Sequence, residues 1–237
     1  MTGSDLIVFV MARGGSTRIP LKNIAMLGKR PILSFTLQDV AELQHEFPDL
    51  TCVLMTDHPA IKEAAALDPY RPDHFEIVQQ SPEEAADMQE FIGLGRVLLE
   101  KELAGNYFKY VMMLGADHVV RSQSLLRDAY CEVQQLVDPG LIVQSVVQVP
   151  IRYHPHRVVT INPESEQARP WPIENGAFLS QNYPKCYALT GGVFALQRSL
   201  IGLQGLQATR RLHALVTEHG LEVDTEADLA EAQALFA

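Results

Sequence analysis

The segment from residue 12 to residue 23 holds the side chains of this 237-residue chain that are best suited to chemistry. Two adjacent glycines, Gly14 and Gly15, let a backbone turn sharply and bring its N–H groups close to an anion. Three cations lie in the same stretch: Arg13, Arg18 and Lys22. Because N–H groups and cations both neutralise phosphate oxygens, the segment predicts a polyphosphate site.

The spacing of this segment differs from two common phosphate-binding motifs. It lacks the glycine, lysine and hydroxyl pattern of a Walker loop, and it holds no G-x-G-x-x-G dinucleotide fingerprint. A second such candidate, Gly93-Leu94-Gly95, does not follow a strand and is predicted to lie inside a helix. An ordinary turn between a strand and a helix, with solvated basic residues, remains the alternative interpretation.

The elements that must position this segment alternate regularly over the first part of the chain. Residues 5–12 form a continuous apolar run, as in a parallel strand buried on both faces, and they lead directly into the loop. Pro31 is expected in the first turn of the following helix, which runs to about His45. Further strands are predicted at 51–55, 75–78 and 109–114, and further helices at 60–67, 87–104 and 122–136. This order predicts a single α/β domain over residues 1–237 with a mostly parallel, layered sheet.

The pattern changes at residue 141. Long β segments are predicted at 142–149, 157–161 and 189–196, with a proline-rich stretch before Tyr187. Residues 213–217 are expected to form a further strand and Glu226 to begin the last helix. A connection this long inside a compact domain points to function, so residues 141–196 are predicted to form a lid or a subunit contact. Apolar strand edges such as 142–149 need a cover, which predicts a homodimer through this excursion.

Composition excludes several classes of function. The chain has 29 acidic and 19 basic residues, a net charge of -10, and no block of lysine or arginine. Binding to duplex nucleic acid is therefore not expected, because it depends on phosphate neutralisation. No apolar run reaches the roughly 18 residues of a membrane span, and the early apolar run lacks a basic flank, so a cytoplasmic location is expected.

Several motifs, taken together, resemble acylneuraminate cytidylyltransferases, also called CMP-sialic acid synthetases. The opening A-R-G-G-S-x-R-I-P-x-K-N-I of residues 12–24 is quite specific to that family. The similarity continues at Thr56-Asp57-His58, at residues 82–87, and at E-V-D-T-E-x-D-L-A near the end of the chain. A looser match, Q-x-x-P-x-x-Y-x-x-x-G, begins at Gln181. The motifs cover nearly the whole chain in the family's order.

The resemblance implies a Rossmann-like three-layer nucleotidyltransferase fold with a β-rich dimerisation excursion. It implies that a hydroxyl of a 2-keto sugar acid attacks the α-phosphate of CTP and that pyrophosphate leaves. Arg13 and Lys22 then act in catalysis. The implied nucleotide contacts are Ala12, Arg13, Gly14, Gly15, Ser16, Lys22, Asn23 and Asp87. The implied acceptor contacts are Arg121, Gln181 and Arg169.

Acidic residues near the end of the chain are candidates for a metal site. Glu222 and Asp224 are spaced i, i+2, which puts both carboxylates on one face of a strand end, and they match paired aspartates of the family. No Lys or Arg is near them in sequence and the cations of the loop are needed for phosphate, so a divalent cation, Mg²⁺ or Mn²⁺, is expected to join them. Asp117 follows the strand 109–114 and is the competing ligand.

Departures from the family leave other functions open. Gly115 stands where the family has a substrate-contacting glutamine, Thr17 where it often has lysine, and Ser81 where it tends to have a nucleotide-contacting arginine. One alternative is a related enzyme that uses another nucleotide or a sugar phosphate, since Asp117 resembles the aspartate of those enzymes. The other is a non-catalytic nucleotide-binding protein.

Some acidic and histidine residues also have purely structural interpretations. Asp228 pairs with Thr225 in a predicted helix cap, and Asp57 is as well suited to capping the helix at residue 60 as to a site. His154 and His156 are expected to be surface or acceptor-contact residues, since no third metal ligand is evident.

Overall fold

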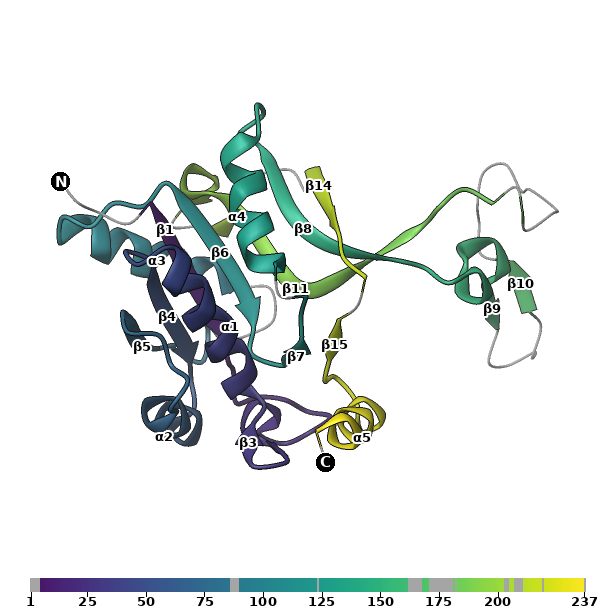
Figure 1. The fold of residues 1–237 in the computed structure, drawn as a ribbon, viewed down its shortest axis with the longest axis horizontal. Helices are drawn as coiled ribbons and strands as arrows, with labels where there is room; N and C mark the ends of the chain where they lie inside the picture. The colour runs from purple at the N-terminus through teal and green to yellow at the C-terminus, as the bar shows by residue number, and fades with distance from the viewer. Residues whose placement is uncertain are drawn as a thin grey trace.

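The computed structural model of the chain describes residues 5–85, 90–122, 124–161, 168–170, 181, 183–202, 205–206, 211–218 and 220–236. A seven-stranded sheet in the order β14-β8-β11-β6-β1-β4-β5 lies at its centre (Figure 1). Its strands are β1 (Leu6–Met11), β4 (Thr51–Thr56), β5 (Phe75–Gln79), β6 (Tyr110–Gly115), β8 (Leu141–Gln148), β11 (Tyr187–Gln197) and β14 (Arg211–Val216). Only β11 runs antiparallel to its neighbours, which confirms the mostly parallel sheet.

Helices cover both faces of this sheet and make three layers (Figure 1). Side chains alternate along β1, so Val8 and Val10 pack on one face while Ile7 and Phe9 pack on the other. The first face is covered by α1 (Leu33–Glu46), α2 (Pro59–Leu67) and α4 (Leu125–Gln135), and the second by α3 (Glu90–Leu103). The predicted three-layer fold is therefore confirmed. None of the described helices is both long and apolar enough to cross a membrane.

Pro31 does not lie in the first turn of α1. It pairs with Met26 in a hairpin of two short strands, β2 (Met26–Leu27) and β3 (Arg30–Pro31). Gly28 makes the turn with φ of 58°, a left-handed conformation that favours glycine. The helix begins two residues later, at Leu33. The turn at Gly28, and not the proline, sets where the helix starts.

A small apolar cluster ties the end of the chain to the loop after β1. It consists of Ile19, Leu27, Ile32, Val119, Val223 and Ala232. These residues come from the loop, from the β2–β3 hairpin, from β7 (His118–Val120) and β15 (Leu221–Glu222), which pair with each other, and from α5 (Glu226–Leu235). The helix α5 begins with the predicted capping box of Thr225 and Asp228. The cluster places Glu222 and Asp224 beside the loop.

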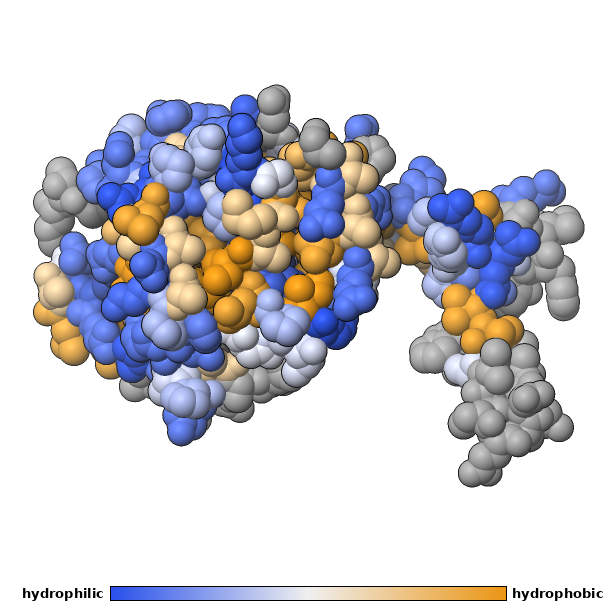
Figure 2. All heavy atoms as spheres, turned by 90° about the horizontal axis from the view of Figure 1, so that it is seen from below, coloured by the Kyte–Doolittle hydropathy of each residue, from blue (hydrophilic) through white to orange (hydrophobic). Residues whose placement is uncertain are grey.

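The described residues between β8 and β11 form an arm that stands away from the sheet (Figures 1 and 2). It carries two short 3-10 helices (Ile151–Tyr153 and Pro155–Arg157) and the strands β9 (Val159–Ile161) and β10 (Ala168–Pro170). The strand predicted at 157–161 begins later, because Pro155 starts a turn that His154 caps. His154 is buried, with Nε2 2.8 Å from the carbonyl oxygen of Pro184, so its interpretation as a surface residue is wrong.

Candidate functional site

A cleft of about 570 Å³ opens where β1 and β6 end at their carboxyl termini. The loop after β1 forms one wall, and residues of β11 and of the β7–β15 segment form the other. Open α/β sheets usually bind ligands at the carboxyl ends of their parallel strands. The cleft therefore lies where this sheet is expected to bind a ligand.

The loop after β1 supplies most of the polar wall. Five of its predicted site residues line the cleft: Arg13, Gly15, Ser16, Lys22 and Asn23. The Nδ2 group of Asn23 donates to the carbonyl oxygen of Arg13 (2.9 Å), which fixes the orientation of the amide. Its Oδ1 atom is buried without a hydrogen-bond partner among the described residues. The loop thus presents cations to the cleft and holds the amide of Asn23 in a fixed orientation.

Two other predicted contacts of this loop lie outside the lining of the cleft. The N–H of Ala12 donates to the carbonyl oxygen of Met55 (3.0 Å), and the N–H of Gly14 donates to Oδ1 of Asp57 (2.7 Å). These N–H groups are already engaged within the chain and hold the shape of the loop, and the nucleotide contacts of Ala12 and Gly14 stay predictions.

Asp57 holds the loop through Gly14 and does not cap α2. That cap is His58, whose Nδ1 accepts from the N–H of Ala60 (3.2 Å). A Cβ atom on Gly14 would lie 2.6 Å from the Cβ atom of His58, so glycine is required at this close approach. The turn after β4 therefore supports the loop after β1.

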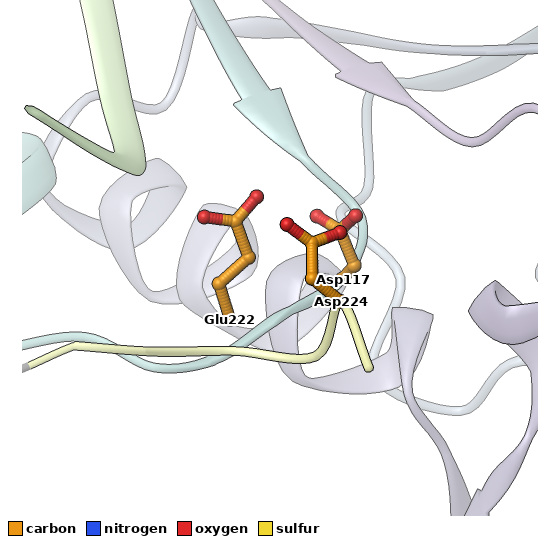
Figure 3. A group of neighbouring side chains, drawn as sticks. All are labelled: Asp117, Glu222 and Asp224. Atoms are coloured by element: carbon orange, nitrogen blue, oxygen red, sulfur yellow. The ribbon is translucent and has the colours of Figure 1, made fainter. Parts of the chain in front are cut away.

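Three carboxylates face one another in the opposite wall of the cleft (Figure 3). Asp117, Glu222 and Asp224 each offer one oxygen, and these oxygens all lie within 4.8 Å of one another. The N–H of Val223 donates to the carbonyl oxygen of Asp117 (2.9 Å), so backbone bonding brings the two segments together. The three residues predicted as metal ligands therefore do form a group.

Two glycines make room for these carboxylates. A Cβ atom on Gly115 would lie 2.5 Å from Oδ1 of Asp117, and one on Gly191 would lie 2.8 Å from Oε2 of Glu222. A larger residue at position 115, such as the glutamine of the resembled family, would therefore displace Asp117. The glycine at position 115, where the resembled family has glutamine, therefore leaves the space that the carboxylate of Asp117 occupies.

Lys22 lies among the three carboxylates. Its Nζ is 2.7 Å from Oδ2 of Asp117 and 2.8 Å from Oδ1 of Asp224, and Arg18 also reaches Asp224 (3.3 Å). The expectation that these carboxylates lack a cation from the chain itself is therefore wrong. Cations distant in sequence reach them because the apolar cluster around Val223 folds the end of the chain against the loop.

Burial and charge shift the pKa values of this group. Burial alone lowers the pKa of Lys22, but the charges and hydrogen bonds of Asp117 and Asp224 outweigh it and raise the pKa above its ordinary value. Burial, and then the charges of Asp117 and Asp224, raise the pKa of Glu222. Lys22 thus stays charged, whereas Glu222 takes up a proton more readily than an exposed glutamate.

Arg121 supports the site from beneath and does not line the cleft. Its side chain is only 1% exposed and forms an ion pair with Asp39 at 2.8 Å. Its guanidinium donates to the carbonyl oxygens of Gly115 (2.9 Å), His118 (2.8 Å) and Gly192 (2.8 Å). These donors hold the turn that carries Asp117, and the substrate contact of Arg121 stays a prediction.

The structure does not place the other three predicted site residues in the lining of the cleft. Gln181 is exposed in the arm and does not line the cleft. The backbone of Arg169 pairs with Thr160 in the β9–β10 ladder, also in the arm. Asp87 lies outside the described residues.

Several residues of the cleft lining were not predicted as site residues, among them Gln80, Phe91, Gln144, Thr190 and Phe194. Gln80 directly follows β5, so its place at the end of a predicted parallel strand could have identified it. The others face the cleft from a helix or from the middle of a strand, where no local pattern marks them.

Comparisons with known proteins agree with this fold. Residues 7–92 match the family model described as cytidylyltransferase. No curated protein sequence matches the chain significantly. A solved structure of CMP:2-keto-3-deoxy-manno-octonic acid synthetase complexed with CTP is 17% identical, with a TM-score of 0.64 and coverage of 98% of both chains.

Two further solved structures are similar. The 4-diphosphocytidyl-2C-methyl-D-erythritol synthase of Anaerococcus prevotii is 14% identical, with a TM-score of 0.60 over 97% of this chain and 95% of that one. A UTP-bound UGPase from Acinetobacter baumannii is 15% identical, with a TM-score of 0.57 over 97% and 92%. The chain therefore has the fold of these nucleotidyltransferase structures, and its first part, residues 7–92, matches the cytidylyltransferase family.

Proposed function

We propose that this protein is a CTP-dependent cytidylyltransferase that activates a 2-keto sugar acid of the sialic-acid type to its CMP-sugar and releases pyrophosphate. The match of residues 7–92 to the cytidylyltransferase family supports nucleotidyl transfer from CTP. The resemblance to CMP-sialic acid synthetases supports the class of acceptor. A structural neighbour is named as a synthetase for another 2-keto acid, which agrees with that class.

One observation carries the proposal: Lys22 and the three carboxylates meet in the same cleft as the loop after β1. Nucleotidyl transfer consists mostly of positioning and of neutralising charge on phosphate oxygens. A loop with Arg13, the Gly15–Ser16 backbone and Lys22 supplies that positive charge. An ordinary turn with solvated basic residues would not bury Lys22 against acidic groups.

The reaction makes and breaks one bond at the α-phosphate. The acceptor hydroxyl oxygen forms a bond to phosphorus and gives up its proton to solvent, the bond from phosphorus to the bridging oxygen breaks, and pyrophosphate leaves with that oxygen. Arg13 and Lys22 face the cleft where negative charge grows on the phosphate oxygens. The oxygens of a bound triphosphate compete with Asp117 and Asp224 for the ammonium group of Lys22.

The three carboxylates fit a divalent cation. Carboxylate oxygens are the ligands that Mg²⁺ prefers in proteins, and Asp224, Glu222 and Asp117 bring three of them within 4.8 Å of one another. Asp224 and Glu222 would hold Mg²⁺ or Mn²⁺, with Asp117 as a further ligand. Such an ion supplies additional neutralisation of the phosphate oxygens.

A second candidate function is transfer to a sugar phosphate, or from another nucleotide. Asp117, directly after β6, belongs to the acidic group, and sugar-phosphate nucleotidyltransferases resemble this chain at that aspartate. The similarity to a UTP-bound UGPase also favours this candidate.

A panel of substrates separates the candidates. The protein is incubated with each of the four nucleoside triphosphates, Mg²⁺, and either a 2-keto sugar acid or a sugar 1-phosphate, and released pyrophosphate is measured. We expect release only with CTP and a keto acid. Release with UTP and a sugar 1-phosphate would favour the second candidate, and nucleotide binding without release would indicate a non-catalytic protein.

A further inference from the structure

Gln80 has a side-chain amide that is buried beside the cleft. The residue directly follows β5, is 3% exposed and lines the cleft. Its backbone N–H donates to the carbonyl oxygen of Thr56 (2.9 Å), which fixes its place beside β4. Its Nε2 has no hydrogen-bond partner in the described part of the chain. Such a group costs free energy in the folded state, so a partner outside the chain would explain it.

The strand order places Gln80 away from the carboxylates. β5 and β6 are separated by β4 and β1, which makes three strand spacings, or roughly 14 Å. The loop after β1 therefore lies between Gln80 at one end and Asp117 at the other. If the triphosphate occupies the loop and the carboxylates, the end of the cleft near Gln80 is left for the nucleoside.

The chemistry at that end fits a nucleobase. Among the described residues that line the cleft, two polar atoms are buried without a partner: the Oδ1 of Asn23, an acceptor, and the Nε2 of Gln80, a donor. Cytosine offers the complement, because its amino group donates while its ring nitrogen and carbonyl oxygen accept. Ala85, the lining residue nearest to Gln80 in sequence, adds no charge.

We infer that the Nε2 of Gln80 donates a hydrogen bond to an acceptor atom of the pyrimidine base and so contributes to binding of the nucleotide. This inference rests on the proposed use of CTP. The residue is a binding residue for the base and has no part in the bond-making step. Such a bond to the nucleotide also explains why the protein keeps a buried Nε2 group that costs free energy when no nucleotide is bound.

The test compares two ligands that share the phosphates. Binding of CTP and of tripolyphosphate is measured by titration calorimetry for the wild type and for Gln80→Met, which keeps the length of the side chain and removes its donor. We expect CTP to bind roughly tenfold more weakly to the variant, as for one lost hydrogen bond. Tripolyphosphate should bind equally to both proteins, because it has no base.

Stability and a neighbouring variant serve as controls. Gln80→Met should unfold at the same temperature as the wild type or higher, since it removes an unsatisfied buried group. Gln79→Met alters the exposed neighbour on β5 and should leave CTP affinity unchanged. Equal CTP affinity in Gln80→Met and wild type would overturn the inference alone, as would an equal loss for CTP and tripolyphosphate. A wild type that does not bind CTP would overturn the proposed function as well.

Discussion

The Nζ of Lys22 lies 2.7 Å from Oδ2 of Asp117, at the point where the loop after β1 meets the turn after β6. The same ammonium group reaches Asp224, a residue 202 positions away in the chain, at 2.8 Å. One buried cation thus joins three segments that are far apart in the sequence. It also balances part of the charge that a divalent cation would otherwise have to balance alone.

Replacing Lys22 by methionine tests two roles of this side chain: stabilising phosphate charge during turnover, and balancing the charge of the carboxylates. Turnover should fall roughly 100-fold or more, by comparison with the loss of other groups that stabilise transition-state charge. Affinity for Mg²⁺ in the absence of nucleotide should rise, because three carboxylates then lack their internal cation. Calorimetric titration with Mg²⁺ checks the second effect, and unchanged Mg²⁺ affinity would show that Lys22 does not compete for the carboxylates.

Asp224→Asn tests the assignment of the primary metal ligand. This variant should lose Mg²⁺-dependent turnover yet still bind CTP, because the loop after β1 is intact. Glu222→Asp should remain active, since Mg²⁺ retains several waters that can take up the shift of a methylene. Turnover is measured as released pyrophosphate over a range of Mg²⁺ concentrations. If Asp117→Asn abolishes the metal dependence and Asp224→Asn does not, our order of ligands is wrong.

Gly191→Ala tests whether the space beside Glu222 matters. The new Cβ atom would lie 2.8 Å from Oε2 of Glu222 and push this carboxylate away from Asp117 and Asp224. Because only the end of a flexible side chain has to move, thermal stability should change little while Mg²⁺ affinity falls. Thermal unfolding and Mg²⁺ titration of the same sample measure both. A variant with wild-type Mg²⁺ affinity would remove Glu222 from the site.

The buried side chain of His118 should make the fold sensitive to acid. Burial, and then the charge of Arg121, lower its pKa to about 3. Below pH 6.5, the ordinary pKa of about 6.5 means that His118 binds a proton in the unfolded chain. In the folded chain the same side chain stays neutral until the pH is much lower. As pH falls from about 6.5 toward 3, this group lowers the free energy of unfolding by up to about 1.4 kcal/mol per pH unit.

Urea unfolding at pH 7 and at pH 5 checks this effect in the wild type and in His118→Gln. The carboxylates contribute to both proteins, so the difference between the two pH dependences reports His118. We expect the variant to lose less stability between the two pH values. Equal losses would mean that His118 is not held neutral in the folded state.

The arm is expected to join two copies of the chain. Ile151 and Tyr153 in the arm and Tyr187 and Leu189 on β11 are exposed, and Figure 2 shows apolar side chains on the projecting arm. Such side chains are usually covered by a partner. Light scattering at micromolar concentration should give twice the mass of one 26.3 kDa chain. A mass equal to one chain would contradict the homodimer.

Local sequence pattern was sufficient for most of the fold. Strands such as β1 and β4 are long apolar runs that end at polar residues, and the alternation with helices leaves few possible topologies. The prediction that Pro31 lies in the first turn of the helix was wrong because the chain turns back at Gly28, three residues earlier, before the helix begins. The surface prediction for His154 was wrong because its burial depends on Tyr183 and Pro184, and Pro184 lies 30 positions later in the chain.

The sequence was sufficient to recognise many of the residues that form the site, but not which of them contact one another. The loop cations and the acidic residues near the end of the chain were both recognised, whereas the pairing of Lys22 with Asp224 depends on packing around Val223 that no local pattern encodes. The resemblance to the family implies that Arg121 contacts the acceptor. Its burial is set by Asp39 and by three carbonyl groups from other segments, which only the folded chain brings together.

Transfer of radioactive phosphorus from CTP labelled at the α-phosphate tests the central claim most directly. The wild type is incubated with the labelled CTP, Mg²⁺ and a 2-keto sugar acid, with Lys22→Met in parallel, and the products are separated by chromatography. The account predicts label in a CMP-sugar with the wild type and at least a hundredfold less with the variant. Label that remains in CTP, or appears only in free CMP, for every sugar acid offered would contradict it.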